Sequence, residues 1–323
     1  MLANNIFTTT NLTFQQQAIA TFTYQYQHNI LYQQYVDALH INIDKVNTIE
    51  DIPFLPIQFF KNKKITTTAF EPEQIFTSSG TTGYTTSSHY IKELSIYQTS
   101  YTKAFEQFYG SITQYCVIGL LPSYLERTGS SLVYMVNDFI VKSNHPLSDF
   151  YLNEYEHLYL MLQQLEYDKQ PTILFGVTFA LLDFAVLYKM NLEHVTIIET
   201  GGMKGRGTEY TRQQIHELLK ARLGCSIIHS EYGMTELLSQ AYTNQTGLFA
   251  TPPWMKVLVR QADNPLQVNL TGKGVLNIID LANIYSCSFI ATDDIGIIYQ
   301  NKNFEVQGRL DTSDTRGCSL LTA

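Results

Sequence analysis

A stretch of small, hydroxyl-bearing residues in the first third of the chain has the composition of an anion-binding loop. The segment reads Phe76-Thr77-Ser78-Ser79-Gly80-Thr81-Thr82-Gly83. Its glycines allow backbone conformations in which consecutive N–H groups converge on an anion, and its hydroxyls supply further donors. We therefore predict that Thr77 to Gly83 hold the triphosphate of ATP. An exposed Ser/Thr/Gly linker has the same composition, and no Walker A lysine follows, so the prediction depends on partners elsewhere in the chain.

Two further loops carry residue types that suit a nucleotide and a metal ion. An apolar run ending at Glu199 leads into Thr200-Gly201-Gly202-Met203-Lys204-Gly205, and a second run leads into Glu231-Tyr232-Gly233-Met234-Thr235-Glu236. A Gly-Gly turn lets a flat base lie against the backbone, and a tyrosine offers a stacking face. Glu236 is a candidate ligand for a magnesium ion that bridges phosphates. Each feature alone also has a structural explanation, as a tight turn, a helix start or a core residue.

Single side chains complete the set of candidates. His89 is a candidate to orient a phosphate or to act as a base, with a surface histidine as the alternative. Lys204 is a candidate cation for pyrophosphate or a carboxylate, with a solvated loop lysine as the alternative. For His229, directly before the second loop, we expect structural packing. Cys318, a lone cysteine near the end of the chain, is by itself expected to be just an exposed residue, although Arg316 beside it would favour the thiolate.

The elements that must position these loops alternate between helix and strand. Helical spacing is predicted over 97–108, 130–141, 155–165, 179–190 and 211–223, after one or two amphipathic helices over 14–39. Compact apolar runs predict strands over 115–121, 172–177, 194–199 and 226–230. This alternation predicts an α/β fold with mostly parallel sheet layers flanked by helices. Ligands bind such sheets beyond the carboxyl ends of the strands, which is where the candidate loops lie.

The last quarter of the chain has a different pattern. It is strand-rich, with predicted strands over 255–260, 274–280, 295–299 and 304–308. We therefore divide the chain into an N-terminal helical segment (1–50), an α/β core (51–250) and a small strand-rich C-terminal part (251–323) that ends with the candidate Cys318.

Composition narrows the class of protein. The 323 residues include 21 Lys and Arg against 29 Asp and Glu, and the net charge of −8 argues against a nucleic-acid binder. The four cysteines are widely spaced, which predicts neither a zinc site nor a disulfide framework and fits free thiols in a reducing cytosol. The first residues lack the features of a signal peptide, and no run reaches transmembrane length. We expect a cytoplasmic protein that does not span a membrane.

Taken in order, four segments resemble the adenylate-forming superfamily, which includes acyl-CoA synthetases and luciferases. Phe76 to Gly83 matches its phosphate loop, and Tyr232-Gly233-Met234-Thr235-Glu236 matches its Tyr-Gly-x-Thr-Glu signature. Thr292-Asp293-Asp294 matches a Thr-Gly-Asp element with the glycine replaced, and Gly308-Arg309-Leu310-Asp311 matches the Gly-Arg-x-Asp of the hinge region.

This resemblance implies an adenylate-forming fold that uses ATP and Mg²⁺. It implies that Asp294 holds the ribose hydroxyls, that Arg309 contacts ribose or phosphate, and that Glu236 holds the metal. The other residues that it assigns to the nucleotide, besides the phosphate loop, are Gly201, Gly202, Glu231, Tyr232, Gly233 and Thr235.

A closer resemblance covers nearly the whole chain. The strings Leu121-Pro122-Ser123-Tyr124-Leu125-Glu126-Arg127, 199–206, 229–237 and Arg316-Gly317-Cys318 are similar to those of the LuxE family, the acyl-protein synthetases of bacterial bioluminescence fatty-acid reductases. The resemblance implies ATP-dependent activation of a fatty acid to an acyl-adenylate and capture of the acyl group on a cysteine. Cys318 sits where that family's acyl-accepting cysteine sits. An acyl-accepting reductase or carrier protein is the implied partner.

The sequence also departs from the wider superfamily. Ordinary adenylating enzymes continue past Gly-Arg-x-Asp into a mobile C-terminal domain with a catalytic lysine, whereas this chain ends 12 residues after Asp311. We expect that full domain to be lacking, so that Lys204 or Lys273 assists adenylation or thiol chemistry replaces the second half-reaction. Two alternatives stay open: an acyl- or aryl-CoA ligase in which coenzyme A is the acceptor, and a catalytically silent nucleotide- or acyl-binding subunit.

Overall fold

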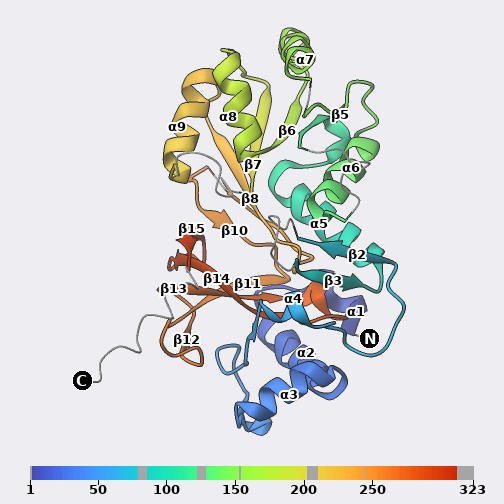
Figure 1. Ribbon diagram of the computed structural model, residues 1–323, viewed down its shortest axis with the longest axis vertical. Helices are drawn as coiled ribbons and strands as arrows, with labels where there is room; N and C mark the ends of the chain where they lie inside the picture. The colour runs from blue at the N-terminus through green and yellow to red at the C-terminus, as the bar shows by residue number, and fades with distance from the viewer. Residues whose placement is uncertain are drawn as a thin grey trace, which may run out of the picture. The chain divides into compact units, whose positions relative to one another are not determined.

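The computed structural model describes residues 2–78, 86–121, 129–152, 154–201, 210–243 and 245–310. The chain divides into two compact units (Figure 1). The first unit comprises Met1–Phe59, Ile65–Thr68 and Pro253–Ala323, and the second comprises Phe60–Lys64 and Ala69–Pro252. The N-terminal helices and the C-terminal strands therefore belong to one unit, although they lie at opposite ends of the sequence.

The second unit is built on a mixed sheet in which five neighbouring strands are parallel. Its strand order is β10-β9-β8-β7-β6-β4-β5, and β5, β4, β6, β7 and β8 form the parallel part. β9 and β10 continue it in antiparallel pairing. The bounds are β4 (Cys116–Leu120), β5 (Asp149–Phe150), β6 (Thr172–Val177), β7 (Val195–Thr200), β8 (Ile228–Tyr232), β9 (Ala241–Thr243) and β10 (Phe249–Ala250).

A separate hairpin in the same unit carries the predicted phosphate loop. It pairs β2 (Gln74–Thr77) with β3 (Ser88–Ile91) in antiparallel register. The helices of this unit are α5 (Leu94–Tyr109), η3 (Ile112–Gln114), α6 (Ser131–Ser143), α7 (Tyr155–Tyr167), α8 (Thr178–Leu187) and α9 (Arg212–Leu223), with α4 (Phe59–Asn62) at its boundary.

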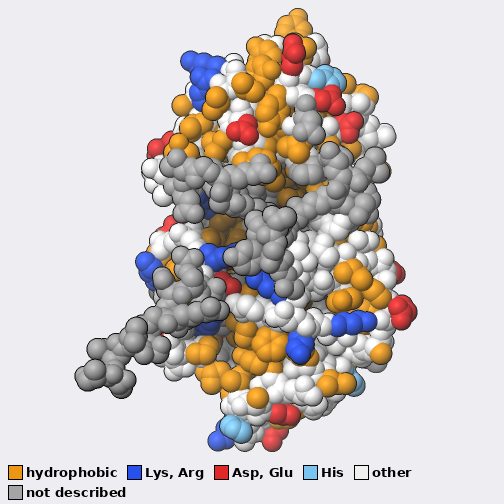
Figure 2. Space-filling model, viewed as in Figure 1, with side chains coloured by type: hydrophobic (Ala, Val, Ile, Leu, Met, Phe, Trp, Pro, Cys, Tyr) orange, Lys and Arg blue, Asp and Glu red, His pale blue; other side chains and the backbone are white. Residues whose placement is uncertain are grey.

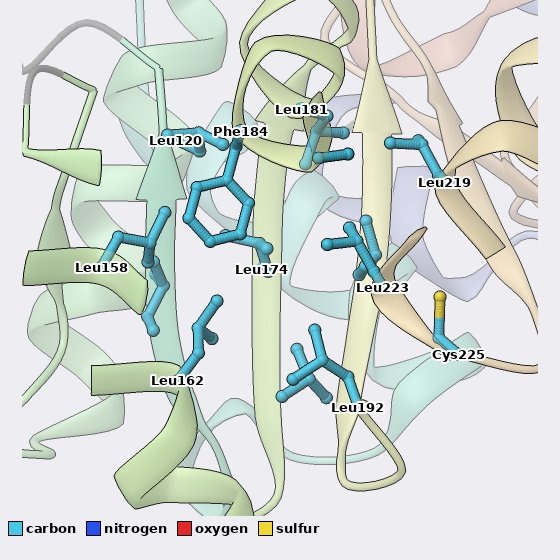
Figure 3. Close-up of a cluster of buried hydrophobic side chains, with 14 of the residues drawn as sticks. Leu120, Leu158, Leu162, Leu174, Leu181, Phe184, Leu192, Leu219, Leu223 and Cys225 are labelled. Atoms are coloured by element: carbon cyan, nitrogen blue, oxygen red, sulfur yellow. The ribbon is translucent and has the colours of Figure 1, made fainter. Parts of the chain in front are cut away.

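Helices cover both faces of the parallel strands. Figure 3 shows leucines of α7 and α9 and Phe184 of α8 packed over one face, against Leu120 and Leu174. The next residue along β6, Phe175, points to the other face, where its ring contacts Phe105 of α5 and Phe139 of α6. Because both faces are buried, the strands read as continuous apolar runs rather than as an alternating pattern.

Some apolar side chains of this unit stay at the surface. Figure 2 shows hydrophobic side chains exposed over α7 and α8. They include Leu160 and Tyr167 on α7 and Val186 and Leu187 on α8, each more than half exposed. Scattered exposed apolar residues are normal in folded proteins, so these do not change the assignment of the core.

The first unit packs the N-terminal helices on an antiparallel sheet. Its strand order is β12-β11-β13-β14-β15, with the short β1 running parallel to β14. The bounds are α1 (Leu2–Asn5), η1 (Ile6–Thr8), α2 (Phe14–His28), α3 (Ile30–Ala38), η2 (Ile43–Lys45), β1 (Leu55–Pro56), β11 (Met255–Arg260), β12 (Val268–Asn269), β13 (Gly272–Asp280), η4 (Leu281–Asn283), β14 (Phe289–Ile298) and β15 (Phe304–Arg309). Gln25 of α2 is fully buried and donates to the Asn283 carbonyl at 2.9 Å, and Ser288 N–H donates to Gln25 Oε1 at 2.9 Å.

The α/β prediction is confirmed, and the structure adds a larger antiparallel component than the sequence indicated. β14 begins at Phe289, six residues before the predicted strand over 295–299, because Ile290 and Ala291 pair with β1 on one side while 289–291 pair with β13 on the other. α8 ends at Leu187, three residues before its predicted end at Met190. In the part of the chain that the structure describes, no helix is long and apolar enough to cross a membrane.

Candidate functional site

The two flanks of the predicted phosphate loop are held side by side. Thr77 lies opposite Ser88 in the β2–β3 hairpin. Ser78 N–H donates to the Ser87 carbonyl at 3.1 Å, and Ser87 N–H donates to Ser78 Oγ at 2.9 Å. Of the predicted triphosphate ligands, Ser79, Gly80, Thr81, Thr82 and Gly83 lie outside the described residues. The hairpin therefore defines where that loop starts and ends, and its binding role stays a prediction.

A third segment packs against the first flank. Thr77 N–H donates to the Gly129 carbonyl at 2.7 Å, and a Cβ at Gly129 would lie 2.6 Å from Thr77 Oγ1. Only a residue without a side chain allows this approach without rearrangement. Thr77 is thus fixed from two directions, by β3 and by the segment before α6.

The second candidate loop leaves the carboxyl end of β8 and turns tightly. Leu237 N–H donates to the Met234 carbonyl at 3.1 Å, which closes a turn around Thr235 and Glu236. Leu237 and Leu238 are buried and anchor the turn, and Ser239 Oγ lies 3.0 Å from Ser100 Oγ of α5. Glu236 lies in this turn and is 6% exposed.

Tyr232 and Gly233 connect β8 to this turn. The Tyr232 ring is half-buried, with its centroid 5.8 Å from that of Phe249. A Cβ at Gly233 would clash with Glu231 Oε1. The glycine of the Tyr-Gly-x-Thr-Glu segment therefore leaves room for the Glu231 carboxyl group in its present position.

His89 lies inside the protein and contacts the second loop. It is 1% exposed, and its Nδ1 lies 2.9 Å from the Thr235 carbonyl oxygen. Its ring packs edge-on against Phe60, with centroids 5.6 Å apart. Burial lowers the pKa of His89 to about 4, so the ring is neutral at pH 7. A carbonyl oxygen only accepts hydrogen bonds, which places the proton on Nδ1.

Two carboxyl groups are buried at the carboxyl ends of neighbouring parallel strands, Glu199 on β7 and Glu231 on β8. The Thr178 hydroxyl at the start of α8 donates to Glu199 Oε1, and Ser230 Oγ donates to Glu199 Oε2 at 3.2 Å. His216 Nε2 lies 3.1 Å from Ser230 Oγ and 3.9 Å from Glu199 Oε2. These contacts connect β7, β8, α8 and α9 directly below the candidate loops.

Glu231 has a different environment. Thr200 Oγ1 donates to Glu231 Oε2 at 2.5 Å. Burial raises the pKa of the Glu231 carboxyl to about 7, with the Thr200 hydrogen bond opposing the rise and the charge of Glu199 adding to it. Sequence reasoning singled out Glu231 as nucleotide-binding but overlooked Thr178, Glu199 and His216 as parts of this site. The one available signal was a carboxylate at the end of an otherwise apolar strand.

The glycine pair after β7 is described only in part. Gly201 has a φ of +81° and is exposed, so it starts the turn in a conformation that favours glycine. Gly202 and Lys204 lie outside the described residues. Their predicted roles in binding a base and an anion stay predictions.

Asp294 and Arg309 form a pair in the first unit. They face each other across β14 and β15, and Arg309 Nε donates to Asp294 Oδ1 at 3.0 Å. The Asp294 side chain is 8% exposed and that of Arg309 is 71% exposed. Thr292 Oγ1 accepts from Asp294 N–H at 3.1 Å, which fixes the backbone of the aspartate. The two residues that the sequence assigned to ribose and phosphate therefore lie in contact.

The residue that replaces the superfamily glycine, Asp293, has its own partners. Gln58 Nε2 lies 2.7 Å from both carboxylate oxygens of Asp293, and the Asp293 carbonyl accepts from Leu310 N–H at 2.7 Å. Arg260 donates to the Thr292 carbonyl at 2.6 Å. Sequence reasoning overlooked Gln58 and Arg260, which lie far from this segment in the chain and belong to no motif.

Three of the four cysteines are described, and none suits a nucleophile. Cys116, Cys225 and Cys287 are buried free thiols. Burial raises their pKa values, to about 11 for Cys116 and Cys225 and to about 12 for Cys287. Such thiols are almost wholly protonated at neutral pH and react poorly. Cys318, the predicted acyl acceptor, lies outside the described residues.

A metal site made only of protein side chains is absent from the described ranges, where no group of three or more His, Cys, Asp or Glu could hold an ion. Mg²⁺ bound with a nucleotide takes most of its ligands from phosphates and water and needs only one or two carboxylates. A single carboxylate held in a tight turn, as in Glu236, fits that requirement.

Comparison with solved structures shows that this fold is similar to that of CoA ligases. The structure aligns with 2-hydroxyisobutyryl-CoA ligase, solved with 2-HIB-AMP and CoA, at a TM-score of 0.67 and 10% identity, over 96% of this chain and 78% of that one. It aligns with ATP-bound MatB from Rhodopseudomonas palustris at a TM-score of 0.54 and 15% identity, over 75% of this chain and 49% of that one. At these identities the likeness concerns the fold, and the chain spans only about half of MatB.

Two sequence comparisons are more specific. The chain is 26% identical to the long-chain-fatty-acid–luciferin-component ligase of Aliivibrio fischeri, over 94% of this chain and 85% of that protein. The profile of the family described as acyl-protein synthetase, LuxE, matches residues 8–323. Because that match covers almost the entire sequence, the chain belongs to the LuxE acyl-protein synthetase family.

Proposed function

We propose that this protein uses ATP to convert a fatty acid into an acyl-adenylate, then transfers the acyl group to Cys318 and on to a partner protein. The observation that carries the proposal is the turn after β8. It presents Tyr232 and the buried Glu236 at the carboxyl end of a parallel strand, which is where nucleotides bind in α/β sheets. The membership of the LuxE family and the name of the Aliivibrio fischeri relative support a fatty acid as substrate.

In the first half-reaction, a carboxylate oxygen of the acid attacks the α-phosphorus of ATP. The bond from that phosphorus to the pyrophosphate oxygen breaks, and pyrophosphate leaves with the electron pair. The hydroxyls and N–H groups from Thr77 to Gly83 would hold the phosphates, Tyr232 would stack on the adenine, and Glu236 would hold Mg²⁺, which supplies charge neutralisation. Asp294 would hold the ribose hydroxyls, and Arg309 would contact ribose or phosphate.

In the second half-reaction, the Cys318 thiolate attacks the acyl carbonyl, a thioester bond forms and AMP leaves. The end of β15 supports this role for Cys318. Leu310 N–H bonds the Asp293 carbonyl beside Asp294, and Cys318 follows Leu310 by eight positions. A chain of that length spans at most about 28 Å. A thiol tethered within that distance of Leu310, which bonds the residue next to the ribose-binding candidate, is suited to collect an acyl group from an adenylate.

An ATP–pyrophosphate exchange assay with a panel of fatty and aryl acids tests the first half-reaction. We expect exchange that depends on a fatty acid and on Mg²⁺. Preference for aryl acids would redirect the proposal to that substrate class. Absence of exchange with every acid would contradict adenylation and favour a silent binding subunit.

Labelling with radioactive fatty acid and ATP tests the second half-reaction. We expect the wild-type protein to carry a thioester that neutral hydroxylamine removes, and Cys318→Ser to lose the label while it retains exchange. Cys225→Ser is the matched control, since that thiol is buried and should leave labelling intact. Continued labelling of Cys318→Ser, or acyl-CoA formation without any labelled protein, would contradict transfer to Cys318.

A further inference from the structure

We infer that His89 is a positioning residue that holds the Thr235–Glu236 turn in the geometry needed to bind the magnesium–nucleotide complex. The inference rests on the proposed function, because it takes Glu236 as the metal ligand. It changes the role suggested by the sequence, in which His89 is a phosphate ligand or a base.

The contact that carries this inference joins two candidate loops. His89 lies on β3 opposite Phe76 of β2, in the hairpin that carries the predicted phosphate loop. Its Nδ1–H donates to the Thr235 carbonyl at 2.9 Å, one residue before Glu236. The two residues are 146 positions apart in the sequence. One hydrogen bond thus connects the strand that follows the phosphate loop to the turn that carries the metal candidate.

The surroundings of the ring make this contact rigid. The imidazole is 1% exposed and packs edge-on against Phe60 at an interplanar angle of 82°. A partly buried carbonyl that loses its donor costs free energy, so the Nδ1 proton stabilises the Thr235 oxygen. The burial of the ring also argues against a role as a base, because a base needs a ring nitrogen that the substrate proton can reach. A neutral ring also lacks the charge that would attract a phosphate.

Two amide variants distinguish the role of Nδ1 from that of Nε2. In His89→Asn the Nδ2 amide takes the place of Nδ1 and still reaches the Thr235 carbonyl, whereas in His89→Gln the amide nitrogen lies where Nε2 lay. His229 supplies the matched control, since its Nδ1 also faces a backbone carbonyl, that of Thr243, at 3.2 Å. The variants are His89→Asn, His89→Gln, His229→Asn and His229→Gln.

The measurement is the affinity for Mg²⁺·ATP in the absence of any acid, by titration calorimetry. We expect His89→Gln to weaken binding about five- to tenfold, which corresponds to the loss of one hydrogen bond. His89→Asn should bind Mg²⁺·ATP within about twofold of the wild type, because it keeps the hydrogen bond to the Thr235 carbonyl. Both His229 variants should bind as the wild type does. Equal affinities for the two His89 variants would overturn the inference.

A second measurement examines the wild-type ring itself. Long-range ¹H–¹⁵N NMR reports which imidazole nitrogen is protonated, and we expect neutral His89 with the proton on Nδ1 at pH 6. A proton on Nε2, or a charged ring at that pH, would overturn the inference even if a variant does not fold. Binding of Mg²⁺·ATP without pyrophosphate exchange would contradict the proposed function alone, whereas no binding by the wild type would contradict both.

Discussion

Glu231 shows how the fold changes the chemistry of a single residue. In the sequence it is an ordinary acid next to a tyrosine, and in the structure it is buried at the end of β8, with Thr200 as its donor. Its pKa is raised to about 7, and the pKa of the buried His89 is lowered to about 4. Both groups are therefore largely uncharged in the mildly acidic range, where an exposed Glu and an exposed His would both be charged.

The contributions of Glu231 and His89 to the free energy of unfolding change with pH in opposite directions. Between pH 4.5 and 7 the unfolded chain loses the Glu231 proton while the folded protein keeps it, so this contribution to stability falls as pH rises. Between pH 4 and 6.5 the unfolded chain binds a proton at His89 that the folded protein excludes, so that contribution rises with pH. The two terms partly cancel in the wild-type protein.

Replacement of Glu231 by Gln removes the first contribution and keeps a side chain of the same shape. We expect the difference in unfolding free energy between wild type and Glu231→Gln to fall by about 3 kcal/mol from pH 4.5 to pH 7 and then to level off. Urea unfolding at several pH values measures it. The difference in unfolding free energy between wild type and His89→Asn should instead rise between pH 4 and pH 6.5. A difference that does not vary with pH would contradict the raised pKa of Glu231.

At the scale of elements, buried hydroxyls connect the ends of strands to helices. Thr178, the first residue of α8, is fully buried and donates to Glu199 at the end of β7. Ser230 of β8 donates to the other oxygen of the same carboxylate. A buried carboxylate without its donors carries a full desolvation cost. These hydroxyls therefore hold the carboxyl ends of the strands in the register from which the candidate loops emerge.

Replacement of Thr178 by Val removes one of these donors and keeps the shape of the side chain. We expect a loss of about 1–3 kcal/mol in unfolding free energy at pH 7, because Glu199 Oε1 loses its partner. Thr99→Val is the control, since that hydroxyl donates to the Ser95 carbonyl at an exposed position of α5. Urea unfolding of both variants tests this, and equal losses would contradict the role of the Thr178 hydroxyl.

The sequence predicted some elements well and others poorly, for physical reasons. The strands near 116, 172 and 195 are mostly apolar because helices cover both faces, so they stand out in the sequence. The β2–β3 hairpin has no such signal, since β3 reads Ser-His-Tyr-Ile and only part of it is buried. The start of β14 escaped prediction because its pairing partners, β1 and β13, are brought together only by the fold.

At the scale of the whole molecule, each unit is assembled from segments that are distant in the chain. In the first unit, α2 packs against residues near position 285, with the ring of Phe22 6.2 Å from that of Phe289. Gln25 bonds Asn283 and Ser288 across separations of 258 and 263 residues. The N-terminal helices thus depend on the C-terminal strands for burial of their inner face.

Replacement of Gln25 by Leu tests this dependence. We expect a loss of about 3 kcal/mol in unfolding free energy, because the Asn283 carbonyl and the Ser288 N–H lose buried partners. Gln16→Leu is the control, since Gln16 is exposed on the same helix. Thermal or urea unfolding measures both variants. A loss no larger than that of Gln16→Leu would show that α2 is not held by this contact.

The sequence by itself determined the family, the alternation of strands and helices in the core, and the candidate loops. These depend on residue type and short spacing, because glycine turns, hydroxyl donors and apolar strands are properties of neighbouring residues. The tertiary structure alone decided the surroundings of those loops: the raised pKa of Glu231, the bond from His89 to Thr235, and the partners of Asp293. Burial and hydrogen bonding between distant segments arise only when the chain packs, so they cannot be predicted from residue type and short spacing.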